Sequence, residues 1–331
     1  QEAEDQYVRT FHEVELDLSH ILESCPPSYF TNEGEKGAKW FLFRGWGPGW
    51  THFQDMLQGW RDKGDLDGLK TESCRPSPEA PFRCSLPGMT RVIQIANYGG
   101  PEVLVPTTHD LPLPAPGEVR LRLTAAGVNF HDIYVRNGLY RTLALPGVPG
   151  LDGVGIVDEV SEGVTSLRKG DRVGYMTTGY GGYAEARNLD AQLAVKLPAR
   201  LSDPQAEATM VRAFTACVLL TRVRQCRAGE TIVVHAGAGG MGQLLTQWAS
   251  KIGANVIATV GSEEKAAVAT DCGASHVILY REEDVAARVT EITRGAGVAA
   301  VYDAVGKDTF AGSMASLSPC GHLVLYGQAS G

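Results

Sequence analysis

The sequence lacks several features that define common classes of protein. No apolar stretch approaches the ~18 residues that a membrane helix needs, so we expect a soluble protein. The seven cysteines are scattered and never spaced as Cys-x-x-Cys. Their number and spacing disfavour a disulfide framework or a cysteine-rich zinc lobe, and favour reduced thiols in the cytoplasm. A formal net charge of −8 disfavours nucleic acid as the principal partner, because backbone phosphates demand a basic surface.

Length and composition predict a globular protein with more than one domain. The 331 residues are 44% apolar and 21% charged, which allows two or three domains with a sizeable core. Residues 1–88 differ in texture from the rest, because they hold four of the five tryptophans and end in a proline-rich linker at 75–87. We leave this segment unassigned, since 8–22 fits a helix and a strand about equally. Met89 resembles a native start, which leaves a fused partner, an expression artefact or translated upstream sequence open for residues 1–88.

Residues 89–212 read as a small β-rich domain. Short β-type runs are separated by glycine and proline, and alternation places Val119, Leu121 and Leu123 on one face of a strand. The predicted strands are 90–95, 118–128, 154–160, 171–176, 182–186 and 193–197. A helical pattern follows at 204–224.

A glycine-rich turn organises residues 213–331. The β-branched run 231–235 leads directly into Gly237, Gly239 and Gly242, spaced G-x-G-x-x-G, and 243–251 follows with a helical apolar face. The first glycine allows a tight turn, the second lets backbone approach a pyrophosphate, and the third lets the helix pack close to the strand. The helix N-terminus completes an anion site. A glycine triplet alone also suits an ordinary loop, but a strand before it and a helix after it favour dinucleotide binding.

Strands alternate with helices after this turn. β-type runs at 231–235, 255–260, 276–279, 298–303 and 322–326 predict five strands of a doubly wound parallel sheet. The fold class is therefore α/β, with a β-rich domain ahead of a Rossmann sheet.

From Met89 onward, many segments together carry a family resemblance. They are YGGPEVL (98–104), AAGVNFHDIYVRNGLY (125–140), GVGIVDEVSEGVTSLRKGDRV (153–173), HAGAGGMG (235–242), VYDAVGKDTF (301–310) and YGQASG (326–331). This part resembles the zinc-independent quinone oxidoreductases of the zeta-crystallin type, in the medium-chain dehydrogenase/reductase superfamily. The resemblance implies a GroES-like domain at 89–212, an NADPH-binding Rossmann domain at 213–331, and a cleft that holds NADPH.

The resemblance also implies particular site residues. Residues at the nicotinamide end, with candidate catalytic roles, are Asn129, Tyr134 and Tyr140. The implied cofactor-binding residues are Thr215, Gly237, Gly239, Gly240, Met241, Gly242, Ser262, Lys265, Tyr280, Val305, Gly327, Gln328 and Ser330. The alternative for the first three is ordinary turn and core packing, and for Thr215 a hydroxyl that bonds its own helix backbone.

The end of the second strand decides between the two nicotinamide cofactors. An NAD enzyme usually places an acidic residue ~20 positions past the motif, and here that count reaches Ser262. A hydroxyl there and the cation of Lys265 suit a 2′-phosphate, and by resemblance Tyr280 joins them. Glu263 and Glu264 would repel a phosphate if they turned inward, or would favour the first turn of the next helix. We expect NADPH to bind more tightly than NADH.

The sequence predicts chemistry without a metal. Zinc-dependent relatives place a cysteine and a histidine ligand at positions that correspond here to Asn129 and Leu151, and neither side chain is a normal zinc ligand. His131 lies nearby, but a lone histidine is more often a structural hydrogen-bonding group. No nucleophile or carboxylate pair stands out, which fits hydride transfer from a cofactor to an electron-poor acceptor.

Several alternatives stay open at the level of sequence. An enone or alkenal reductase of the same superfamily fits the motifs as well as a quinone reductase does. A non-catalytic NADPH-binding protein of the crystallin kind, or an inactive fragment, is a third possibility. Family members are homodimers that continue past YGQASG with a sixth Rossmann strand, so by resemblance the chain is truncated and lacks the dimerising strand.

Overall fold

The computed structural model describes residues 88–177 and 179–331. The expectations for 1–87, including the choice between helix and strand at 8–22 and the linker at 75–87, lie outside these residues. The described chain forms two compact units, a first unit that ends at Met210 and a second unit that begins at Val211. Among the described residues, no helix is long and apolar enough to cross a membrane.

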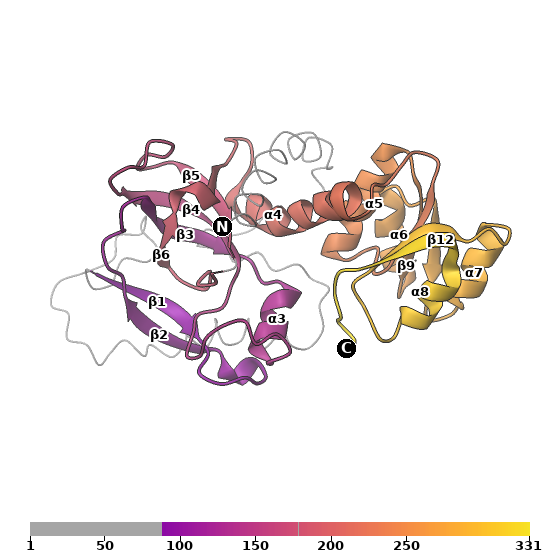
Figure 1. Ribbon diagram of the computed structural model, residues 1–331, viewed down its shortest axis with the longest axis horizontal. Coiled ribbons are helices and arrows are strands. Elements are labelled where there is room, and N and C mark those ends of the chain that lie inside the picture. The colour runs from indigo at the N-terminus through magenta and orange to yellow at the C-terminus, as the bar shows by residue number, and fades with distance from the viewer. Residues whose placement is uncertain (1–87, 178) are drawn as a thin grey trace. The chain divides into compact units, whose positions relative to one another are not determined.

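The first unit is built mainly from antiparallel strands (Figure 1). Its strands are β1 (Met89–Gln94), β2 (Val105–Asp110), β3 (Glu118–Ala126), β4 (Asp152–Val160), β5 (Arg172–Met176), β6 (Ala186–Asp190) and β7 (Ala194–Lys196). A five-stranded sheet has the order β6-β3-β4-β5-β7, and β1 pairs with β2 alone. The helix α3 (Phe130–Arg136) follows β3, and α4 (Asp203–Val218) leads to the second unit.

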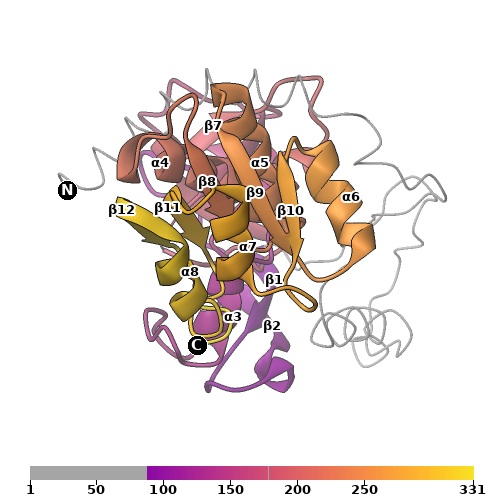
Figure 2. The same ribbon diagram turned by 90° about the vertical axis from the view of Figure 1, so that its right-hand side faces the viewer.

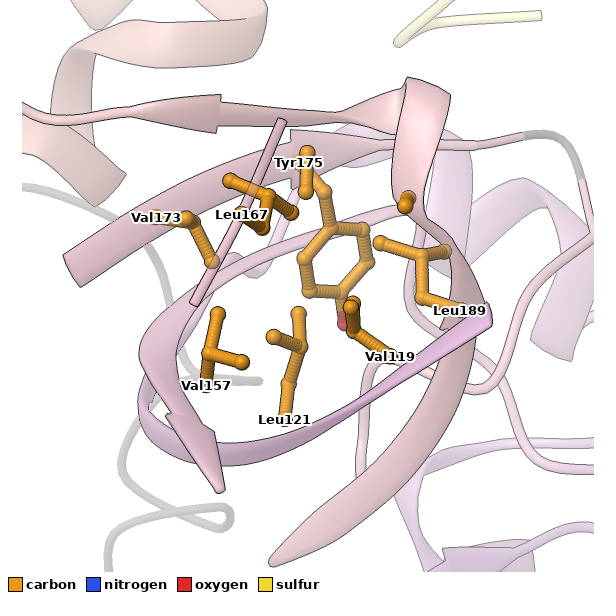
Figure 3. Close-up of a cluster of buried hydrophobic side chains, with 9 residues drawn as sticks. Val119, Leu121, Val157, Leu167, Val173, Tyr175 and Leu189 are labelled. Carbon is orange, nitrogen blue, oxygen red and sulfur yellow. The ribbon is translucent and has the colours of Figure 1, made fainter. Parts of the chain in front are cut away.

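The core of this sheet confirms the predicted alternation in β3. Val119 and Leu121 are buried in one cluster with Val173 and Tyr175 (Figure 3). Leu123 is partly buried and packs against this cluster. Burial of a side chain of this size stabilises the fold by about 1.5–3 kcal/mol. The cluster therefore stabilises the sheet that contains β4 and the strand β3, which α3 follows in sequence.

Three differences from expectation concern the start of a strand, the end of a helix and a helix that was not predicted. A strand was expected at 182–186, but β6 begins at Ala186, and only Ala184 forms an isolated bridge, to Val92. The predicted helix at 204–224 is α4 followed by a π-helical turn at Leu219–Val223. The sequence did not predict α3, because its seven residues are too few for a clear helical period.

The second unit is a parallel sheet in the order β10-β9-β8-β11-β12, which Figure 2 shows side by side. Its strands are β8 (Thr231–Val234), β9 (Asn255–Val260), β10 (His276–Leu279), β11 (Val298–Asp303) and β12 (Leu317–Leu325). Its helices are α5 (Gly240–Ile252), α6 (Glu263–Asp271), α7 (Val285–Ile292) and α8 (Phe310–Ser316). Helix α5 contacts α6, and α7 contacts α8, as expected when helices cover both faces of a doubly wound sheet. The predicted fold class is confirmed.

The last strand is longer than expected. The sequence predicted 322–326, but β12 begins at Leu317, whose partner in β11 is Val298. The register then jumps, so that His322 lies opposite Ala300. Residues 318–321 form the irregular stretch between these pairs, and Cys320 there has a φ of +64°. Proline and glycine in this stretch masked the strand in the sequence.

Candidate functional site

The glycine-rich turn joins β8 to α5 in a tight bend. The amide of Gly237 donates to the carbonyl of Thr259 at 3.0 Å, and the amide of Gly239 donates to that of Ala236 at 2.8 Å. A Cβ at position 242 would lie 2.2 Å from the Ala236 carbonyl oxygen, and one at 237 would lie 2.6 Å from the Ala258 Cβ. These two positions therefore require glycine.

The N-terminus of α5 has no side-chain cap. Its N-cap residue, Gly239, has no side chain to cap the helix, so the first N–H groups need another acceptor. The side chain of Arg212 on α4 lies against this end, because a Cβ on Gly240 would be 2.9 Å from Arg212 Nε. A guanidinium beside free amides is a setting in which phosphate binds well. The sequence did not point to Arg212, which stands in a helical pattern without a spacing signal.

A second group of polar residues surrounds Gly261, at the end of β9. Ser262 is the N-cap of α6, and its hydroxyl accepts from the amide of Lys265 at 3.4 Å. A Cβ on Gly261 would lie 2.7 Å from the Tyr280 hydroxyl and 3.3 Å from Arg281 Nε. Arg281 adds a cation that the sequence reasoning missed.

The two glutamates beside Ser262 have a structural role. Glu263 and Glu264 form the first turn of α6 and are exposed. Carboxylates at that position are favoured by the helix dipole. Of the two readings that the sequence left open, the structure fits the first-turn role.

The last two strands end in paired loops. The carbonyl of Val305 accepts from both the amide and the hydroxyl of Ser330, each at 2.8 Å. The amide of Ala329 donates to the carbonyl of Ala304 at 3.1 Å. Gly327 packs so closely that an added Cβ would lie 2.9 Å from the same carbonyl oxygen. The loop after β12, which includes Gln328, is therefore held against the turn after β11.

The parallel sheet gathers most of the predicted cofactor residues along one edge. Residues 237–242, 262, 280, 305 and 327–330 all follow the carboxyl ends of strands, which lie at the same edge of a parallel sheet. Lys265 lies on the first turn of α6. Thr215 lies on α4, where its hydroxyl donates to the carbonyl of Val211 at 2.7 Å. This hydrogen bond fits the alternative role for Thr215, in which its hydroxyl bonds the backbone of its own helix.

The candidate catalytic residues gather around α3 in the first unit. Asn129 is the N-cap of α3, and its Nδ2 donates to Asp152 Oδ1 at 2.9 Å. The rings of Tyr134 and Tyr140 meet edge to face with centroids 5.1 Å apart. His131 lies edge-on to Tyr140 at 5.4 Å, so the structure places a histidine within this aromatic group.

The aromatic group includes one tyrosine that the sequence reasoning missed. Tyr180 has its hydroxyl 3.2 Å from His131 Nε2 and hydrogen-bonds the hydroxyl of Thr142. Its φ of +55° is unusual for a bulky residue. Burial lowers the pKa of His131, which favours a neutral ring that bonds to Tyr180.

Three carboxyl groups lie close to Asn129 and to the nearby Gly127. A Cβ on Gly127 would approach both Glu207 Oε1, at 2.3 Å, and Asp152 Oδ1, at 2.4 Å, so these carboxyl groups converge there. Asp132 accepts from the amide of Asn129 at 2.8 Å. Burial raises the pKa of Asp132 to about 7, although hydrogen bonds from Asn129 and Tyr183 oppose the shift.

Two family models match parts of the chain. Residues 115–199 match the alcohol dehydrogenase GroES-like domain, and residues 240–331 match the zinc-binding dehydrogenase domain. The chain is 44% identical over 243 residues to a quinone oxidoreductase of Pseudomonas aeruginosa, and the match covers 73% of this chain and 75% of that one. The chain belongs to the quinone oxidoreductases of the medium-chain dehydrogenase/reductase superfamily. It is an oxidoreductase, as the sequence predicted.

Two further relatives have names that mention a cofactor or a substrate. The structure of Escherichia coli quinone oxidoreductase complexed with NADPH is 40% identical, with a TM-score of 0.70, and the match covers 73% of this chain and 74% of that chain. A 2-haloacrylate reductase of Burkholderia is 40% identical over 248 residues, with 73% of this chain and 74% of that one covered.

Proposed function

We propose that this oxidoreductase binds NADPH and reduces a quinone by hydride transfer. The observation that carries the proposal is the edge of the parallel sheet, where the uncapped start of α5 lies one strand away from the group around Gly261. The first suits a diphosphate and the second a 2′-phosphate. The NADPH complex of the E. coli relative supports the same assignment.

The residues of the chain fit such a cofactor. The close packing at Gly237 and Gly242 leaves no room for a side chain at these two positions, and Arg212 provides a cation beside the turn. When bound, NADPH supplies a hydride that, with one proton from solvent, converts a quinone to a hydroquinone and leaves NADP⁺. The paired loops that carry Val305 and Gly327 present main-chain groups at the edge where ligands bind in such sheets.

The first unit supplies the proposed substrate contacts. By resemblance, we assign Asn129, Tyr134 and Tyr140 to the acceptor and the nicotinamide end of the cofactor. The two tyrosine hydroxyls could donate hydrogen bonds to the oxyanion that develops on a quinone. Asn129 already donates to Asp152, which fixes the orientation of its amide. A cytoplasmic location stays a prediction.

The residues near Gly261 predict selectivity for NADPH over NADH. Replacing Lys265 by alanine should raise the Kd of NADPH about tenfold, because one charge-assisted contact to the 2′-phosphate is lost. The Kd of NADH, which has no such phosphate, should stay within about twofold. Fluorescence titration of both cofactors measures the effect.

Lys251→Ala provides the matched control for Lys265→Ala. Lys251 is an exposed lysine in the last turn of α5, at the end opposite the glycine-rich turn. Its replacement should leave both dissociation constants unchanged. Equal affinity of the unaltered protein for NADPH and NADH would overturn the selectivity.

The choice of acceptor is tested by turnover. With NADPH present, 1,4-benzoquinone should be reduced faster, judged by kcat/KM, than a 2-alkenal or 2-chloroacrylate. The alternative, reduction of an activated alkene, is favoured by the 40% identity to 2-haloacrylate reductase. A higher kcat/KM for either alkene would select that alternative, and NADPH binding without turnover of any acceptor would indicate a non-catalytic protein.

A further inference from the structure

Four buried polar side chains form a continuous hydrogen-bonded chain beneath the carboxyl edge of the parallel sheet. The hydroxyl of Thr259 lies 2.9 Å from His235 Nδ1, and His235 Nε2 lies 3.0 Å from the hydroxyl of Ser313. That hydroxyl in turn donates to Asp303 Oδ2 at 2.7 Å. None of the four is more than 2% exposed. Together they link β9, the end of β8, α8 and the end of β11.

The direction of each hydrogen bond follows from the charge of Asp303. Burial raises the pKa of this carboxyl, but hydrogen bonds from Thr309 and Ser313 outweigh it, so the pKa is lowered and Asp303 is ionised. An ionised carboxylate can only accept hydrogen bonds, so the Ser313 hydroxyl donates its one proton to the hydrogen bond with Asp303. The Ser313 oxygen must then accept from His235 Nε2–H.

The same reasoning fixes the tautomer of His235. Burial lowers the pKa of His235, which keeps the ring neutral. A neutral ring with its proton on Nε2 has an acceptor at Nδ1, and Thr259 donates to it. The four residues therefore form one directed chain, from Thr259 through His235 and Ser313 to Asp303.

The hydrogen-bonded network reaches the two turns assigned to the cofactor. Asp303 Oδ1 accepts from the amides of Val305, at 2.8 Å, and Gly306, at 3.2 Å, and so shapes the turn after β11. Within the network, His235 directly precedes Ala236, whose φ of +51° begins the glycine-rich turn. One network therefore fixes both backbone turns.

A hydrolytic role for these residues does not fit. In a catalytic triad the histidine lies between the serine and the aspartate and takes the serine proton. Here the serine lies between the other two and gives its proton to Asp303. Ser313 is also fully buried, so a substrate cannot reach it.

We propose that His235 and Ser313 are positioning residues, which hold the glycine-rich turn and the Val305 turn at the spacing that one dinucleotide requires. This inference rests on the proposed NADPH function. Tight binding of a ligand that touches both turns requires the intact hydrogen-bonded network. Binding of a ligand that occupies only the adenosine end does not. Adenosine 2′,5′-bisphosphate is such a shorter ligand, since it lacks the nicotinamide half.

The test compares Ser313→Ala with Ser316→Ala. Ser316 is equally buried on the same helix, but its hydroxyl donates only to the carbonyl of Gly312, at 2.7 Å. Loss of a hydrogen bond in a network that includes a charged group should raise the Kd of NADPH about tenfold in Ser313→Ala. The Kd of adenosine 2′,5′-bisphosphate should change less than about twofold, and Ser316→Ala should change neither.

A second set of variants covers the case in which Ser313→Ala does not fold. Thr259→Val removes the donor to His235 with little change of shape and should also weaken NADPH binding, while Thr259→Ser should restore it. Thr246→Val is its control, because Thr246 is a buried threonine whose hydroxyl has no hydrogen-bond partner among the described residues. Thermal unfolding of each variant separates lost stability from lost affinity.

Each outcome decides the matter. NADPH affinity equal in Ser313→Ala and Ser316→Ala would overturn the positioning role while leaving the proposed function intact. Equal loss of affinity for NADPH and for the bisphosphate would also overturn the positioning role, because the hydrogen-bonded network would then affect the whole site. If the unaltered protein binds neither ligand, the proposed function itself fails, and this inference fails with it.

Discussion

Replacing Gly242 by alanine should weaken NADPH binding by about 100-fold or more. The added Cβ would lie 2.2 Å from the Ala236 carbonyl oxygen and 2.7 Å from the Cα of Gly237, and both are backbone atoms of the turn. Since no flexible side chain can give way, the turn and the start of α5 must separate. The amides assigned to the diphosphate would then lose alignment, and each charge-assisted hydrogen bond is worth about 1.5–3 kcal/mol. Fluorescence titration with NADPH measures the loss.

Gly312→Ala is the matched control for this variant. Gly312 is also a helical glycine in the second unit, but a Cβ there would meet nothing within 4 Å. Alanine is better than glycine in a helix by about 1 kcal/mol, so this variant should be at least as stable as the unaltered protein. Its NADPH affinity should not change. Normal NADPH binding by a folded Gly242→Ala protein would contradict the assignment of the turn to the diphosphate.

The elements that the sequence predicted well have strong local signals. β9, β10 and β11 have the predicted bounds, because each contains a short β-branched or apolar run next to polar or glycine residues. β9 and β11 are buried along almost their whole length, whereas β10, at the edge of the sheet, buries only Ile278. β12 was placed too late, since its first residues pair across an irregular stretch that only tertiary contacts stabilise. α3 and β2 are short and partly exposed, so their sequences show little periodicity.

The part of the candidate site that a sequence motif defines through its backbone could be predicted. The part that is formed by side chains from positions distant in sequence was harder to predict. Gly237, Gly239 and Gly242 form the expected strand–turn–helix unit. Arg212 reaches this turn from the preceding helix, and no spacing in the sequence signals that approach. The chain from His235 to Asp303 is of the same kind, because its residues are far apart in sequence and meet only when the parallel strands align. Motifs therefore identify the cofactor turn, while the network that orients it depends on the fold.

Asp132 was not noticed in the sequence, because a single aspartate carries no sign of its burial. In the structure it is almost fully buried, with the carboxyl groups of Asp152 and Glu207 in the same region. Burial and repulsion from Glu207 raise its pKa from 3.8 to about 7. The folded protein therefore binds a proton at Asp132 more tightly than the unfolded chain does.

This raised pKa predicts that the first unit loses stability as the pH rises. The contribution of Asp132 is fully present below its unfolded pKa of 3.8 and is lost as the pH rises through about 7. The difference between these two values corresponds to on the order of 4 kcal/mol in the free energy of unfolding. Asp132→Asn, which is neutral at every pH and keeps an oxygen to accept from Asn129, should remove this dependence.

The variant should therefore gain stability relative to the unaltered protein between pH values of about 4 and 7, and the gain should level off above that range. Urea unfolding at a series of pH values measures the difference between the two proteins. Asp158→Asn, which alters an exposed carboxylate in the same unit, is the control for removing a carboxylate at the surface. If the curves for Asp132→Asn and the unaltered protein run parallel, the carboxyl group is already ionised in the folded state. In that case its hydrogen bonds from Asn129 and Tyr183 outweigh the cost of burying its charge.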